Sequence, residues 1–270
     1  MKKFGLYLLV AVLLMQFVPP SCKTVPLSGR QQLTFLPESM LVEMGLSNYS
    51  EFLSTHKIST DQRQTAMLNN VGNRIANAVE DYMKNNGFGS RIAEFQWEFN
   101  LIEEDMVNAW AMPGGKIVFY SGILPVTQND AGVAVVMGHE IAHVVARHGN
   151  ERMSQQLLVQ TGGIALSVAL REKPEETRNM FLATYGIGSA IGVVLPYSRA
   201  HEREADRLGM IFMAMAGYDP REALAFWERM EEMSGGGGPP EFLSTHPTSA
   251  GRIRDIKNFL PEAMQYYKPH

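Results

Sequence analysis

The chain has 270 residues, which is long enough for one large domain or two small ones with a buried core. Hydrophobic residues make up 45% of it and charged residues 19%, a composition typical of globular rather than disordered proteins. The net charge is −4, the pI is about 6.0, and no basic stripe alternates with aromatic residues. The composition therefore argues against a nucleic-acid partner.

Residues 1–21 have the three-part layout of a secretory signal. Two lysines precede an apolar run, Phe4 to Met15, and small and turn-forming residues follow. The run is too short to span a bilayer comfortably, so we expect a cleaved signal; an uncleaved N-terminal membrane anchor is the alternative.

The only cysteine, Cys22, stands directly after this signal, where a lipoprotein precursor is cleaved. Pro19 and Pro20 depart from the usual lipobox, and plain secretion with an unmodified cysteine is the alternative. We expect a periplasmic protein that is anchored to the outer membrane through a lipidated Cys22.

The first half of the mature chain predicts helices. Residues 28–57 are expected to form a mainly helical arm. After Ser59, apolar residues recur every four positions from Met67 to Val79, which predicts a helix with one buried face. Asn85-Asn86-Gly87 ends this helix.

A small sheet is predicted next. Phe95 to Glu103 alternates apolar and polar residues, as a half-buried strand does. Val107–Met112 and Lys116–Tyr120 follow as strands on either side of the turn Pro113-Gly114-Gly115. We expect an antiparallel sheet here and helices nearly everywhere else, so the fold class is α+β and mainly helical.

The second half predicts further helices. The first runs from Asp130 to about Arg147, with Thr127 and Asp130 as a capping pair and Gly149 as its end. Two apolar, glycine-rich runs follow, 157–170 and 179–197. The second is long enough for a membrane span, but its glycines and proline favour a buried or membrane-touching helical hairpin. The remaining predictions are helices at 199–216 and from Asp219-Pro220 to Met233, a flexible SGGGGPP loop, a last helix from Thr248, and a single domain over residues 28–267.

The string HEIAH, His139 to His143, carries the strongest chemical signal. Two histidines at i and i+4 share one helix face, so both imidazoles can bind one Zn²⁺. Glu140 borders the open position of such a metal and can accept a proton from metal-bound water. Arg147 and His148, just beyond, are predicted to complement the charge at the C-terminal end of the helix.

A third ligand is expected from SRAHEREADRLG. Glu202 and Asp206 share a helix face, so we assign Glu202 as the ligand. Asp206 is the second catalytic candidate, orienting a ligating imidazole or forming a hydrogen bond at the reaction centre. Gly209 would let another helix approach closely. Glu204 points elsewhere and is predicted to be a solvated charge. His201 points away from Glu202 around the helix and is not assigned as a ligand. The alternative for the whole segment is a helix face that carries only salt bridges.

These motifs, with NAWAMPGGKI before them and STHPTSAGRI after them, resemble the zinc metallopeptidase family that contains HtpX and the CAAX prenyl protease. The resemblance runs from Ser28 to Tyr267. HtpX and the prenyl protease span the membrane several times, whereas this chain has no convincing span after its signal. It is therefore more similar to the secreted lipoprotein branch of BepA and LoiP.

The resemblance implies a zincin-type catalytic domain of the gluzincin group, which holds one zinc ion per chain. It implies Glu202 as the third ligand and Glu140 as the general base. It also implies that 107–112 is an edge strand on which a substrate peptide adds in extended form, with Asn108, Ala109 and Trp110 as the binding residues.

The hexapeptide EFLSTH occurs twice, ending at His56 and at His246, but the flanking residues share nothing, so no repeat is indicated. His56 is expected on the surface. His246 is a candidate fourth zinc ligand that holds the enzyme quiet, or a hydrogen-bond donor to the transition state; a structural loop histidine is the alternative. Arg252 is a candidate oxyanion stabiliser, with a helix-surface ion pair as the alternative.

Two functions remain open. The first is a zinc metalloendopeptidase that cleaves misfolded or misassembled envelope proteins. The second is a chaperone-like outer-membrane assembly factor that binds unfolded chains and cleaves little, because a blocked coordination site silences a peptidase without removing its motif. A metal protein without peptidase activity has little support.

Overall fold

A computed structural model of the chain describes residues 22–190, 194–234, 240–246 and 251–269. The predicted signal at residues 1–21, most of the predicted SGGGGPP loop and Thr248 lie outside the described residues. Two short strands, β1 (Cys22–Thr24) and β2 (Gln31–Leu33), pair antiparallel at the start of the described chain.

The central sheet has three strands, β3 (Glu98–Ile102), β4 (Ala109–Met112) and β5 (Lys116–Tyr120), in the order β3-β5-β4. The hairpin of β4 and β5 confirms the prediction. The expected antiparallel pairing is wrong for β3, which runs parallel to β5. The reason is that β5 is buried along its whole length and takes the central place, which leaves β4 at an edge.

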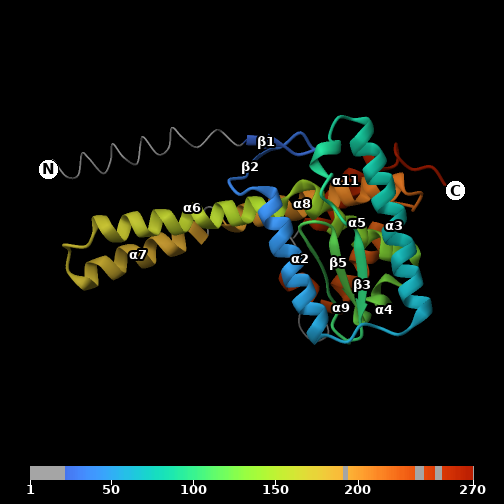
Figure 1. The fold of residues 1–270 in the computed structure, drawn as a ribbon, viewed down its shortest axis with the longest axis horizontal. Helices are drawn as coiled ribbons and strands as arrows, with labels where there is room; N and C mark the ends of the chain where they lie inside the picture. The colour runs from blue at the N-terminus through green and yellow to red at the C-terminus, as the bar shows by residue number, and fades with distance from the viewer. Residues whose placement is uncertain (1–21, 191–193, 235–239, 247–250, 270) are drawn as a thin grey trace.

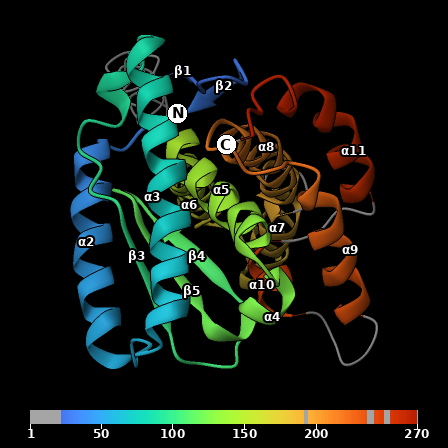
Figure 2. The same cartoon turned by 90° about the vertical axis from the view of Figure 1, so that its right-hand side faces the viewer.

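Helices cover both faces of this sheet, which is why β5 is apolar on both sides (Figure 2). Val118 and Tyr120 pack with Tyr49 of helix α2 (Glu38–Thr55) on one face. Ile117 and Phe119 belong to the main core on the other face, with helices α3 (Gln62–Asn85) and α5 (Asp130–Ala146). Helix α3 confirms the predicted amphipathic helix, and Asp61 caps it.

Helix α5 forms as predicted, but its ends differ. Asn129 caps it, by accepting a hydrogen bond from the Gly132 N–H, in place of the predicted Thr127 and Asp130 pair. The chain then kinks at Arg147, which has a left-handed backbone (φ 59°), and helix α6 begins at His148. Gly149 therefore lies inside a helix and does not end one.

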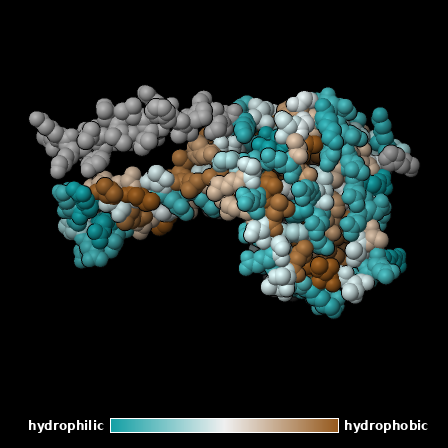
Figure 3. Space-filling view, in the orientation of Figure 1, coloured by the Kyte–Doolittle hydropathy of each residue, from teal (hydrophilic) through white to brown (hydrophobic). Residues whose placement is uncertain are grey.

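Helices α6 (His148–Ala169) and α7 (Glu175–Ser189) form the predicted hairpin, and it protrudes from the body of the protein (Figure 1). The hairpin is not buried, because many of its apolar side chains are exposed on its surface (Figure 3). Within the described ranges, we find no helix with the length and apolarity that crossing a membrane requires. The large apolar side chains exposed on the hairpin are Leu157, Leu158, Ile164, Val168, Met180, Phe181 and Ile187.

Helix α8 (Leu195–Met215) returns to the body and packs along α5. Two glycines set the contact between them: a Cβ on Gly138 would lie 2.6 Å from the Gly209 carbonyl oxygen, and one on Gly209 would lie 2.7 Å from the His139 nitrogen. This confirms the close approach predicted from Gly209. The remaining elements are η1 (Gly89–Arg91), η2 (Ser121–Ile123), α4 (Leu124–Thr127), α9 (Glu222–Ser234), α10 (Glu241–Thr245) and α11 (Arg252–Ala263).

Candidate metal centre

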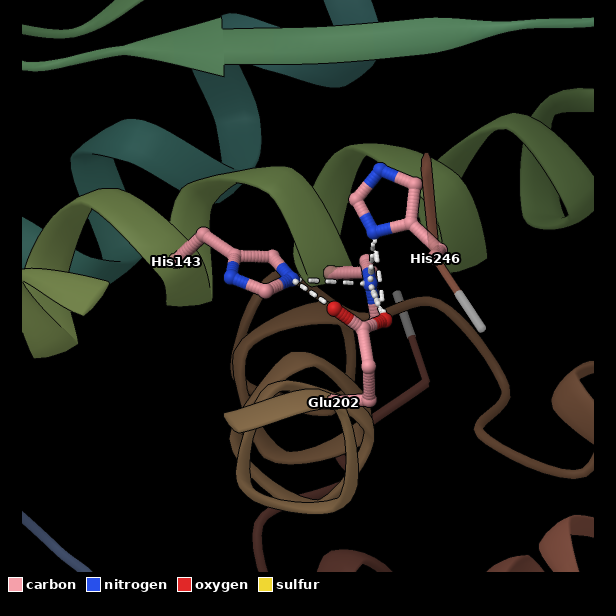
Figure 4. Close-up of side chains that lie close together, drawn as sticks. His143, Glu202 and His246 are labelled. Carbon is pink, nitrogen blue, oxygen red and sulfur yellow. Dashed lines mark hydrogen bonds and ion pairs between the residues drawn. The ribbon is translucent and has the colours of Figure 1, made fainter. Parts of the chain in front are cut away.

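Four side chains from three parts of the chain converge beside the sheet. His139 and His143 come from α5, Glu202 comes from α8, and His246 follows α10. Figure 4 shows the side chains of His143, Glu202 and His246 close together. One ligand atom from each residue lies within 4.8 Å of the others. The i, i+4 spacing places both α5 histidines on one face, and the glycine contact between α5 and α8 brings Glu202 up to them.

The donor set fits a divalent cation. The Nε2 atoms of His139 and His143 lie 3.1 Å apart, and the Glu202 carboxylate lies 3.3 Å from the first and 3.5 Å from the second. Glu202 is 4% exposed, and its Oε1 has no hydrogen-bond partner among the described residues. Buried carboxylate oxygens and imidazole nitrogens at one point are ligands that suit zinc.

The pKa values point the same way. Burial lowers the pKa of His139, but the carboxylates of Asp206 and Glu202 outweigh this effect and raise it to about 9. Burial holds the pKa of His143 well below its usual value, which favours the neutral, metal-binding form. Burial raises the pKa of Glu202, yet the surrounding histidines bring it well below its usual value. The cluster therefore attracts positive charge.

His139 has an outer partner in Asp206. Its Nδ1 lies 3.0 Å from the Asp206 Oδ1, which leaves Nε2 to face the ligand cluster. Burial raises the pKa of Asp206, but Arg252 and His139 reverse this effect and lower it. A carboxylate at this position fixes the tautomer and the orientation of a ligating imidazole. This is the first of the two arrangements considered for Asp206.

Arg252 lies beside Asp206 and close to the cluster, with its Nη2 3.8 Å from the Glu202 Oε2. Its Nη2 donates to the Asp206 Oδ1 at 2.7 Å, and its Nη1 donates to the His246 carbonyl at 3.3 Å. The guanidinium carbon lies 3.4 Å from the centre of the Trp227 ring. Arg252 is 5% exposed, so a helix-surface ion pair does not describe it. It holds Asp206 and the loop that carries His246.

Glu140 borders an open cleft beside the cluster. It is 1% exposed, and its Oε1 lies 3.4 Å from the His246 Nε2. Burial raises its pKa, as a group that accepts a proton near neutral pH requires. The residues that line the cleft include Trp110, Ala111, Met112, Glu140, His143 and His246.

Strand β4 forms one wall of the cleft and lies at the edge of its sheet. Of the three residues assigned to substrate binding, Trp110 lines the cleft, whereas Asn108 and Ala109 are buried and do not. The Asn108 Oδ1 accepts a hydrogen bond from the Ala109 N–H at 2.9 Å. Ala111 and Met112 line the cleft instead.

The two EFLSTH copies have different surroundings. His56 ends α2, is partly exposed, and stacks on Phe52 with a centroid distance of 3.8 Å. His246 is 7% exposed, and its Nδ1 lies 3.1 Å from the Glu202 Oε2 and 3.2 Å from the His139 Nε2. Only the second copy belongs to the cluster.

A second buried polar cluster was missed at the sequence level. Glu204 is 7% exposed and not solvated, and His148 is 1% exposed and does not serve as a helix-end charge. The His148 Nε2 lies 2.9 Å from the Glu204 Oε2, and the His201 Nε2 lies 2.9 Å from the Glu151 Oε2. Arg30, from the segment before β2, bonds to both carboxylates.

An H-E-x-x-H helix that is joined by a glutamate from a second helix is the ligand arrangement of a metallopeptidase of the gluzincin type. Comparison with known proteins agrees with this class. Residues 69–260 match the family described as peptidase family M48, and the chain belongs to that family.

Curated relatives share this similarity. The chain is 38% identical to the mitochondrial metalloendopeptidase OMA1 of Schizosaccharomyces pombe over 175 residues, which is 64% of the chain and 50% of the relative. It is 31% identical to OMA1 of Saccharomyces cerevisiae over 258 residues, 90% of the chain and 70% of the relative. It is 27% identical to the beta-barrel assembly-enhancing protease of Escherichia coli over 270 residues, 96% of the chain and 52% of the relative. The chain thus spans about half the length of the Schizosaccharomyces pombe and Escherichia coli relatives.

The match to this family confirms the prediction that the chain is a metallopeptidase. The finer affiliation, to HtpX and the prenyl protease or to a lipoprotein branch, stays a prediction.

Proposed function

We propose that the chain is a zinc-dependent metalloendopeptidase of the cell envelope that cleaves misfolded or misassembled proteins. The observation that carries the proposal is the convergence of His139, His143 and Glu202 at a cleft that Glu140 borders. The names of its relatives, two mitochondrial metalloendopeptidases and an assembly-enhancing protease, support the peptidase part.

The residues divide the chemistry between them. His139, His143 and Glu202 would hold one zinc ion, which supplies Lewis-acid activation of water when bound. Glu140 accepts the proton of the attacking water and returns it to the leaving amine. Asp206 keeps the His139 Nδ1–H directed away from the cluster, so that Nε2 stays available as a ligand.

The edge strand supplies the binding surface for a substrate backbone. Among the described residues, strand β4 pairs with a neighbouring strand, β5, on one side only, so its other side offers a free strand edge next to Glu140 and His143. An extended peptide that pairs there is recognised mainly through its main chain. Such recognition suits unfolded segments of varied sequence and supports the proposed substrate class.

His246 gives the site a quiet state. Its Nδ1 lies 3.1 Å from the Glu202 Oε2 and 3.2 Å from the His139 Nε2, so it would serve as a fourth ligand when an ion is bound. We favour this role over transition-state donation, because Nδ1 points into the cluster while Nε2 faces Glu140. The same contact favours a second candidate function, a chaperone-like assembly factor that binds unfolded chains and cleaves little.

The location is part of the proposal. The signal-like residues 1–21 and Cys22 support export to the periplasm and lipid attachment at the outer membrane. Metabolic labelling with a radioactive fatty acid tests this point: label in the parent and none in Cys22→Ala is expected, and equal label in both would contradict it.

The decisive experiment compares the parent with Glu140→Gln. The amide keeps the size of the side chain but accepts no proton, so we expect bound zinc at parental stoichiometry and a loss of unfolded-casein cleavage of about 100-fold or more. A chelator should abolish cleavage by the parent. Full cleavage by Glu140→Gln refutes the mechanism. Complementation of a deletion strain by Glu140→Gln favours the chaperone-like function.

A further inference from the structure

The ligand His143 is backed by a buried row of polar side chains. Its Nδ1 lies 2.9 Å from the Nδ1 of His148, and the His148 Nε2 lies 2.9 Å from the Glu204 Oε2. His148 and Glu204 are 1% and 7% exposed. The other α5 ligand, His139, contacts a carboxylate directly. The two ligands therefore have different outer partners.

One arrangement of protons satisfies this row. The His143 Nε2 faces His139 and Glu202, so its lone pair must be free for a metal and its single proton must lie on Nδ1. That proton is donated to the His148 Nδ1, which leaves the His148 proton on Nε2. The His148 Nε2–H then donates to the Glu204 carboxylate, which ends the row as an acceptor.

Arg30 holds the end of the row in place. Its Nε donates to the Glu204 Oε2 at 2.9 Å, and its two terminal nitrogens donate to Glu151 at 2.9 and 2.7 Å. Ser28 also donates to Glu204. Together with His148, these donors surround the Glu204 carboxylate, so its oxygens act as acceptors at the end of the row.

We propose that His148 is a positioning residue for the metal ligand His143, and that Glu204 and Arg30 fix its orientation. The proposal rests on the proposed function, since it concerns the same metal centre. Each α5 ligand is then oriented by an anion that an arginine holds: His139 by Asp206 and Arg252, and His143 by Glu204 and Arg30 through His148.

The competing explanation is a structural ion network that only fastens the N-terminal segment to α6 and α8. Glu151 is the matched control, because it bonds to the same arginine and is equally buried but has no contact with a ligand of the metal. If the network is purely structural, substitutions at His148 and at Glu151 should both lower stability, and neither should change the affinity for the metal.

Three variants separate these explanations in full-length Glu140→Gln protein, which does not digest itself. His148→Phe keeps the stacking on His201 but removes the acceptor for the His143 Nδ1–H. His148→Asn restores an acceptor near the Nδ1 position. Glu151→Gln is the control. The readouts are zinc affinity by competition with a chromogenic chelator, the visible spectrum of the cobalt-substituted protein, and the melting temperature without metal.

We expect His148→Phe to weaken zinc binding by about 10- to 100-fold and to change the cobalt spectrum, which reports ligand geometry. His148→Asn should recover most of the affinity, and Glu151→Gln should lower only the melting temperature. Parental zinc affinity and an unchanged spectrum in His148→Phe would overturn the proposal.

If His148→Phe does not fold, Glu204→Gln decides the question. It keeps the shape of the side chain but presents a neutral acceptor to His148, so weaker zinc binding is expected and parental affinity overturns the proposal. Casein cleavage by the unsubstituted protein tests the proposed function separately. A protein that binds zinc as described but cleaves nothing would refute the peptidase and leave the role of His148 standing.

Discussion

Replacing Arg252 with methionine removes a guanidinium that lies between two buried carboxylates. Its Nη2 is 2.7 Å from the Asp206 Oδ1 and 3.8 Å from the Glu202 Oε2. Both acids are about as buried as the arginine, with 6% and 4% of their surface exposed. Methionine fills most of the space but leaves both anions without this cation.

The structure supports a large effect on the free energy of unfolding. Removing one partner of a buried ion pair costs about 3–5 kcal/mol, because the remaining charge is buried and unpaired. The lost stacking on Trp227 would cost up to about 2 kcal/mol by itself, but the two losses overlap. We expect Arg252→Met to lose about 3–5 kcal/mol. Adding Asp206→Asn to Arg252→Met should recover about 2 kcal/mol, since one stranded charge is removed.

Urea unfolding followed by circular dichroism measures these changes. The protein is Glu140→Gln with a chelator, so that a metal does not neutralise the stranded carboxylates. Arg207→Met is the control, because it breaks an ion pair with Glu262 that is 29% and 35% exposed, and should cost less than about 1 kcal/mol. A loss below about 1 kcal/mol in Arg252→Met, or additive effects with Asp206→Asn, would refute the reasoning.

Three other results are expected. His246→Ala should raise the basal rate of casein cleavage several-fold, because it removes the side chain that would act as a fourth ligand; a lower rate would show that His246 acts as a transition-state donor. His201, Arg30 and other partners lower the pKa of Glu151 to about 2, although burial raises it, so its stabilising contribution is present above about pH 4.5 and is lost as the pH falls toward 2. In metal-free protein, urea titrations between these pH values should show a steeper loss of stability for the parent than for Glu151→Gln, and parallel curves would contradict this. Gly209→Ala should weaken zinc binding in the chelator competition by about 10-fold or more, since its Cβ would lie 2.7 Å from the His139 nitrogen. Parental affinity would show that α5 and α8 can move apart without disturbing the ligands.

The cluster could be predicted where its geometry is local. His139 and His143 are related by one helical turn, and so are Glu202 and Asp206, so spacing alone places each pair on one face. Contact between α5 and α8 depends on tertiary packing, which spacing does not reveal. The resemblance to a known family supported that contact.

His148 could not be predicted in the same way. In an uninterrupted helix it would point about 140° away from His143. The left-handed residue Arg147 breaks the helix and turns His148 back toward the ligand. In the sequence, Gly149 indicates an interruption near this point, but it predicts the end of the helix at Gly149, whereas Gly149 lies inside α6.

Glu204 was misjudged for a related reason. It lies about 200° around α8 from Glu202, on the opposite side of the helix. If only the side with Glu202 were buried, Glu204 would face solvent. The structure buries both faces, because α5 covers one and the N-terminal segment covers the other. Its partner Arg30 is 174 positions away in the sequence, beyond the reach of any local pattern. The parallel pairing of β3 with β5 is non-local in the same sense.

The contact between Gly138 and Gly209 also bears on which ion the site selects. Two ligands are rigidly attached to one helix and the third to the other, so the separation of the two helices sets how large an ion the three can hold at once. The size of ion that fits therefore depends on a backbone contact between two residues that are not ligands themselves. A redesign for a larger ion would begin at these two glycines and leave the three ligands unchanged.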